Sequence, residues 1–121
     1  MKLTNLEILN AKEPLNELVK QQFPVKVSLA LIKLVRKLDE FLVPIEQVRD
    51  GLIKTYGKPD PNNSKQIIVE PSDDGWVKFT EEFAELISQE VEVVIDKVAL
   101  PDTLEISPAV LFALEKFIKT N

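Results

Sequence analysis

Apolar residues spaced three and four positions apart dominate the first half of the chain and predict two helices there. The first is expected over about residues 5–21, because Thr4 and Glu7 have the spacing of a capping box, in which each side chain satisfies a backbone N–H at the helix start. Pro14 removes one backbone hydrogen bond and predicts a kink or a broken first turn. Phe23 and Pro24 then end the helix. Its buried stripe is expected to consist of Ile8, Ala11, Leu15 and Leu18.

A second helix is predicted over about residues 25–56, with a kink near Pro44 and an end at Gly57. Its apolar residues form a heptad stripe of the coiled-coil type. The stripe consists of Val27, Leu31, Leu34, Leu38, Phe41, Ile45, Val48 and Leu52. At about 1.5 Å per residue this helix is about 45 Å long and the first about 25 Å. The first helix can therefore cover only about half of the stripe. The rest of the chain, a second copy or another protein must bury the remainder.

Residues 58–79 predict a loop followed by a β-hairpin. The polar segment 58–65 contains two prolines and is the one plausible hinge. Strands are expected over residues 66–70 and 76–79, on either side of a turn at residues 71–75 that ends in glycine.

Residues 80–119 predict a helix, a strand and a last helix. Thr80 is expected to cap the first of these, and the β-branched run 91–98 is the best strand in the chain. Ser107 and Pro108 begin the last helix. Its buried stripe is expected to consist of Val110, Leu111, Leu114, Phe117 and Ile118.

These elements predict a single α+β domain, residues 1–121. An antiparallel helical hairpin with a long second helix (residues 4–57) is joined to a C-terminal half (residues 66–119). That half is expected to hold a small sheet with antiparallel pairing and two short helices.

The composition narrows the chemistry that is open to the chain. It has no cysteine and no histidine, which excludes disulfides, thiolate and imidazole metal ligands, and the usual bases for a serine nucleophile. Nothing in the sequence brings acids, Tyr56 and a lysine together, so we predict no enzymatic activity, no small-molecule substrate and no cofactor. The adjacent acid pairs 39–40, 73–74 and 81–82 are interpreted as solvated charges rather than metal ligands.

The charge balance argues against nucleic acid as a partner. The formal net charge is −5, whereas nucleic-acid-binding proteins carry a basic excess. Lys33, Arg36 and Lys37 form a local basic patch without aromatic neighbours for stacking, and a solvated helix face is favoured there. Glu90, Glu92 and Asp96 share one face of the strand at 91–98. That face is either solvated or recognises a basic partner, and the first interpretation is favoured.

Two aromatic residues are candidates for contacts with a partner. Trp76 is the single tryptophan, and indoles serve both as core anchors and as interface residues. Phe112 faces away from the buried stripe of its helix, so its ring is either exposed or covered by another molecule. The opening residues lack the apolar region of a signal peptide, and no apolar stretch is long enough to span a bilayer. We therefore expect no membrane association and a cytoplasmic location.

The order of these patterns resembles a family of small uncharacterised proteins of tailed bacteriophages and prophages. The similarity lies in residues 3–18 (LTNLEILNAKEPLNEL) and 23–26 (FPVK), and it continues through the heptad helix to residues 54–57 (KTYG). It returns at residues 90–95 (EVEVVI) and 104–114 (LEISPAVLFAL). Pro14 departs from the family's uninterrupted first helix. The resemblance implies a viral setting in the cytoplasm of a host cell, and no catalytic residue.

From these patterns we predict a non-catalytic, self-associating protein that binds other proteins. The first hypothesis is an accessory protein or chaperone in virion assembly, with a viral structural protein as partner. The second is an inhibitor of a host enzyme or defence factor, in which the acidic strand face and Trp76 make the contacts. The residues predicted to make protein contacts are Leu38, Phe41, Ile45, Val48, Leu52, Trp76 and Phe112.

Overall fold

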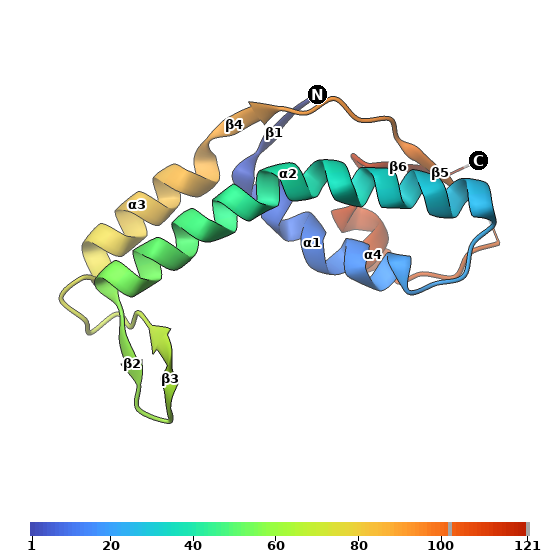
Figure 1. Cartoon of the computed structure of the whole chain (residues 1–121). Helices are drawn as coiled ribbons and strands as arrows, with labels where there is room; N and C mark the ends of the chain where they lie inside the picture. The colour runs from blue at the N-terminus through green and yellow to red at the C-terminus, as the bar shows by residue number, and fades with distance from the viewer. Residues whose placement is uncertain (102, 121) are drawn as a thin grey trace. The chain divides into compact units, whose positions relative to one another are not determined.

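A computed structural model describes residues 1–101 and 103–120 of the chain (Figure 1). The predicted α+β class is confirmed. Helix α1 (Asn5–Val19) and the long helix α2 (Val25–Tyr56) form a helical hairpin. Two-stranded sheets and two shorter helices, α3 (Trp76–Ser88) and α4 (Pro108–Ala113), follow.

The chain divides into two compact units. The first unit consists of residues 1–42 and 90–121, and the second of residues 43–89. Helix α2 continues through Pro44 and contributes its first part to one unit and its last part to the other. This division differs from the predicted one, which separated a hairpin of residues 4–57 from the half at residues 66–119.

The first unit begins as the sequence pattern predicts. The Thr4 side-chain oxygen accepts the N–H of Glu7 at 3.1 Å, and the Glu7 carboxylate accepts the N–H of Thr4 at 3.1 Å, which confirms the capping box. Helix α1 then continues through Pro14. Its buried face contains the predicted stripe of Ile8, Ala11, Leu15 and Leu18.

Two small sheets bring distant parts of the first unit together. Strand β1 (Lys2–Thr4) pairs antiparallel with β4 (Glu90–Glu92), and Leu3 lies opposite Val91. Strand β5 (Val98–Leu100) pairs in parallel with β6 (Ile118–Thr120). Helix α4 lies in the connection between β5 and β6 and contacts α1. The core of this unit contains side chains from α1, from the first part of α2 and from these returning segments: Leu31, Leu34, Leu38, Leu42, Val93, Leu100, Leu114 and Phe117.

The C-terminal elements differ from the prediction in two places. The predicted strand at residues 91–98 is interrupted, because pairing of β4 ends at Glu92 and β5 begins at Val98. The start of α4 is confirmed: the Ser107 hydroxyl accepts the N–H of Val110 at 3.3 Å. The helix ends at Ala113, earlier than predicted. Of its predicted buried stripe, Leu114, Phe117 and Ile118 are buried, whereas Val110 is half-buried and Leu111 is exposed.

In the second unit the predicted hairpin is placed too late in the chain. Strands β2 (Lys58–Asp60) and β3 (Asn63–Ile68) form an antiparallel hairpin. The predicted loop at residues 58–65 therefore contains β2 and the start of β3, whereas residues 66–68 of the strand predicted at 66–70 lie in β3. The Asp60 carboxylate accepts the N–H of Asn62 at 2.9 Å, and this local bond favours the turn at residues 61–62. Residues 76–79, predicted as a strand, form the start of α3.

The start of α3 is set by the turn before it. The Asp73 carboxylate accepts the N–H of Glu70 at 2.8 Å, and the Asp73 carbonyl accepts the N–H of Trp76 at 3.1 Å. The helix therefore begins at Trp76, after Gly75, and the prediction that Thr80 caps it is wrong. Its aromatic residues are spaced three and four apart, and the ring centroids of Trp76 and Phe79 lie 6.2 Å from each other.

Candidate protein-binding surfaces

The residues predicted to make protein contacts differ in their exposure to solvent. Leu38 and Ile45 are buried within the chain. The side chains of Phe41, Leu52 and Trp76 are half-buried. Of the predicted residues, those that stand clearly in solvent are Val48 and Phe112, the latter 75% exposed.

Of the covers expected for the remainder of the α2 stripe, the rest of the chain itself suffices at Leu38 and Ile45, which are buried without a second molecule. Besides α1 and the first part of α2, the first unit contains residues 90–121. Leu100, Leu114 and Phe117 from that returning segment are core residues of the same unit. Leu38 is fully buried and is not available to a partner in this conformation.

A different apolar stripe of α2 is exposed. Val25, Leu29 and Ile32 are four and three residues apart, so they lie on one face of the helix, and all three are exposed. Leu29, which is 53% exposed, lies in the middle of this stripe. Sequence analysis predicted the neighbouring heptad stripe that starts at Val27. It did not predict the stripe of Val25, Leu29 and Ile32, although the spacing of these residues is equally typical of a helix.

A groove of about 520 Å³ lies between the first part of α2 and residues 94–98. Leu29, Leu34 and Val94 contribute to its apolar lining, and Val94 is 81% exposed. Its charged lining consists of Lys26, Lys33, Lys37, Lys97 and Asp96. Four lysines against one aspartate give the groove a positive charge, although the chain as a whole carries −5.

Phe112 lies between two smaller hollows of the first unit. One, of about 480 Å³, is lined by α4 and by residues that include Ile118. The other, of about 420 Å³, extends from Phe112 to Glu7 on α1. The prediction that Phe112 faces away from the core is confirmed by its exposure.

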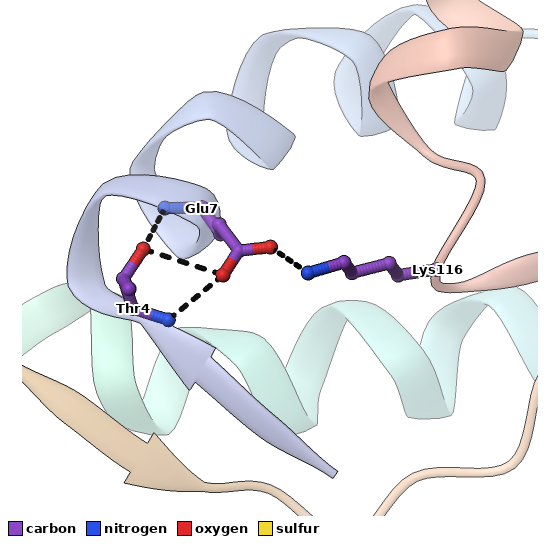
Figure 2. Close-up of polar contacts among 3 residues, drawn as sticks. All are labelled: Thr4, Glu7 and Lys116. Atoms are coloured by element: carbon purple, nitrogen blue, oxygen red, sulfur yellow. Dashed lines mark hydrogen bonds and ion pairs between the residues drawn. The ribbon is translucent and has the colours of Figure 1, made fainter.

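The second hollow is bordered by an ion pair that joins α1 to the segment after α4. Figure 2 shows the Lys116 ammonium against the carboxylate of Glu7, whose other oxygen accepts the backbone N–H of Thr4. The pKa of Glu7 is lowered below its usual value, chiefly by the hydrogen bond from Lys116 and to a smaller extent by the one from Thr4. Glu7 therefore caps α1 and also fixes the segment that carries Lys116.

In the second unit one polar contact connects the end of α2 to α3. The Tyr56 hydroxyl donates a hydrogen bond to the Glu82 carboxylate, which together with partial burial raises the pKa of Tyr56. On α3 the rings of Phe79 and Phe83 stack with centroids 5.7 Å apart. Trp76, half-buried at the start of this aromatic row, is held by packing and is only partly accessible.

The other candidate acidic side chains are solvated or paired with nearby residues. Asp73 accepts the N–H of Glu70 and lies 3.9 Å from the Lys58 ammonium. Glu90, Glu92 and Asp96 are exposed, while Val91, Val93 and Ile95 between them are buried or half-buried, so the predicted alternation is confirmed. Across residues 1–101 and 103–120, no group of three acidic side chains gathers as a metal site would require.

Among the helices that the structure describes, none combines the length and the apolar content needed to cross a membrane. The resemblance to phage proteins remains a prediction. Comparison with protein-family models, curated proteins and solved structures found no match.

Proposed function

We propose that this chain is a non-catalytic, phage-type binding protein that acts through contacts with other proteins, as an accessory protein or chaperone of virion assembly in the host cell cytoplasm. The observation that supports it is the exposed apolar surface of the first unit. Val25, Leu29 and Ile32 on α2 are in solvent, and so is Val94 on the other side of the groove. Exposed apolar side chains that gather around a groove are typical of protein-binding sites.

The side chains of the groove favour binding over catalysis. Its ionisable groups are lysines and one aspartate, and the chain has neither histidine nor cysteine to supply a base or a nucleophile near neutral pH. Lysine ammonium groups around an apolar floor provide charge and contact area for a partner.

The exposed acidic face keeps inhibition of a host factor as a second candidate function. Glu90 and Glu92 lie on β4 with their side chains in solvent, and Asp96 follows on the same side of the alternating segment. Such a row complements a basic groove on another protein. The partner that is captured separates the two functions, because assembly requires a viral structural protein and inhibition requires a host enzyme or defence factor.

The test is capture of partners from lysates of bacteria that carry the corresponding phage or prophage, followed by mass spectrometry. Leu29→Asp, paired with Val94→Asp, places charge on the proposed surface. Val77→Asp is the matched control, because Val77 is an exposed valine of the second unit. We expect the groove variants to lose the partner and the control to keep it. If all variants capture the same proteins as the wild type, this surface is not the binding site.

Self-association is tested separately by multi-angle light scattering. We propose that the chain forms homo-oligomers through its exposed apolar residues, with Val48 and Phe112 as the accessible members of the predicted set. A molar mass of a single chain at high concentration would exclude self-association and would leave binding to other proteins untouched.

A further inference from the structure

We propose that the groove between the first part of α2 and residues 94–98 binds an extended, acidic segment of a partner protein. This inference rests on the proposed function and specifies the chemistry of the partner at the same site.

The charge of the groove selects an acidic ligand. Lys26, Lys33 and Lys37 are spaced seven and four residues apart on α2, so their stems follow the same side of the helix. Lys97 adds a fourth ammonium group from the opposite wall, against the single carboxylate of Asp96. Since the rest of the chain is acidic, this local excess of positive charge attracts carboxylates at the groove while the remaining surface repels them.

The lining between the lysines selects apolar side chains as well. Leu29, Ala30 and Leu34 lie along the helix wall, and Val94, Ile95 and Val98 along the other. A ligand that placed only charges here would leave exposed leucine and valine side chains in contact with water. A segment that alternates acidic and apolar residues satisfies both sets of groups.

The second wall favours an extended ligand. Residues 93–97 connect strands β4 and β5, and over residues 93–96 their side chains alternate between buried or half-buried and exposed positions, as in a strand. An extended segment can run alongside this wall with its side chains directed alternately toward the lysines and toward the apolar floor.

Nucleic acid fits the same groove less well. None of the groove-lining residues in the described chain is aromatic, so bases have no stacking platform. The lysines here stand without the arginine fork that phosphate groups favour, and the apolar side chains of the groove have no counterpart on a phosphate backbone.

The experiment is an unbiased selection from random peptides of about twelve residues, which leaves room on both sides of the roughly five extended residues that follow the ~16 Å from Lys26 to Lys37. The full chain is immobilised, a random peptide library is selected on it, and the affinity of the enriched peptides is measured by fluorescence anisotropy. We expect enrichment of Asp and Glu interspersed with Val, Ile and Leu. Affinity should fall when NaCl is raised from about 0.05 M to about 0.5 M, because the contacts are exposed charges.

Charge variants test whether the selected peptide binds in the groove. Lys26→Glu combined with Lys33→Glu is expected to reduce affinity by at least about tenfold, since two favourable charges become unfavourable ones. Lys26 is the second residue of α2, where an acidic side chain suits the helix N-terminus, and far-UV circular dichroism checks that the variant is folded. The double Lys→Arg variant preserves charge and should retain binding. Lys65→Glu with Lys78→Glu is the matched control on the second unit.

Enrichment of neutral or basic peptides overturns the inference, and so does an equal loss of affinity in the control. Failure to select any peptide also overturns it. Competition by single-stranded DNA at comparable affinity would show that the groove binds nucleic acid instead. If no acidic peptide binds but partner capture still depends on Leu29 and Val94, the acidic ligand is wrong and the proposed function stands. If capture does not depend on those residues, the proposed function fails.

Discussion

Replacing Gly57 by alanine is expected to destabilise the second unit strongly. Gly57 follows the last residue of α2, and its N–H donates to the Ile53 carbonyl at 2.7 Å. A Cβ at this position would lie 2.7 Å from the Ile67 side chain and 2.8 Å from the Ile68 carbonyl oxygen, and it would also collide with the Ile53 carbonyl. Two of these three neighbours are backbone atoms and cannot rotate away. Gly57 therefore permits the β-hairpin to pack directly against the end of α2.

The magnitude follows from overpacking, which costs about 1–3 kcal/mol when a methyl group is forced into a filled space. Gly51 provides the matched control, because it lies within α2 with nothing within 4 Å of a Cβ placed there. Gly51→Ala should stabilise by about 1 kcal/mol through helix propensity. The two alanine variants are therefore expected to differ by about 2–4 kcal/mol, which corresponds to roughly 10 °C in Tm for a chain of this size.

The assay is thermal and urea unfolding followed by the fluorescence of Trp76, the single tryptophan, which lies in the same unit as Gly57. Gly57→Ala should unfold at lower temperature and lower urea concentration than the wild type, and Gly51→Ala at higher values. If Gly57→Ala were as stable as Gly51→Ala, the close approach at Gly57 would not exist in solution.

Three further predictions concern titration and the core. Tyr56 is the only tyrosine, so the absorbance of tyrosinate should report a pKa above the ordinary value of about 10, and Glu82→Gln should return it toward that value. Because the folded-state pKa is raised, this contact stabilises the fold below about pH 10 and is lost as pH rises through the folded pKa. The lowered pKa of Glu7 has the opposite sign: its stabilising effect is complete above the unfolded pKa of about 4.3 and is lost as pH falls through the folded value. Wild type should therefore exceed Glu7→Gln in stability at neutral pH but not in strong acid, and an equal difference at both pH values would contradict the assignment. Leu38→Ala should lower the free energy of unfolding in urea by about 2–5 kcal/mol, because Leu38 is fully buried. Phe112→Ala should change it by less than about 0.5 kcal/mol, because Phe112 is exposed. Equal effects of the two substitutions would contradict the burial of Leu38 and the exposure of Phe112.

Local chemistry determined how much of the fold could be predicted from the sequence. The helices of the hairpin were predicted within two residues because each end has its own signal, such as the Thr4 capping box and the glycine that follows Tyr56. The helix cap at Ser107 was likewise predicted from two adjacent residues, Ser107 and Pro108. These interactions lie within one or two turns of the chain.

The segment at residues 58–79 was predicted only in part, at residues 66–68 of β3, because its sequence signals are ambiguous over short distances. Trp76 and Phe79 fit an alternating strand pattern within four residues, and the helical spacing emerges only when Phe83 is included. The turn at residues 61–62 depends on an Asp60 hydrogen bond rather than on a glycine, which made the later Gly75 turn look stronger.

The candidate binding surface could not be predicted for a different reason. Lys33 was recognised as part of a basic patch, but Lys97 and Val94 are far from it in sequence and meet α2 only in the folded unit. The burial of Leu38 is likewise a property of the folded first unit, to which residues 90–121 belong. Pattern analysis of one helix cannot show what a distant strand covers.

The discontinuous make-up of the first unit affects the order in which the protein folds. Strand β1 cannot pair before β4 has been synthesised, and β5 cannot pair before β6 has been synthesised. The first unit therefore cannot complete its folding until residue 120 has left the ribosome. Residues 43–89 form one uninterrupted stretch with short-range pairing and can fold earlier during synthesis. Until that late closure, the part of the core that residues 90–121 supply, which includes Leu100, Leu114 and Phe117, is missing from the unit, and an incomplete core is a target for molecular chaperones.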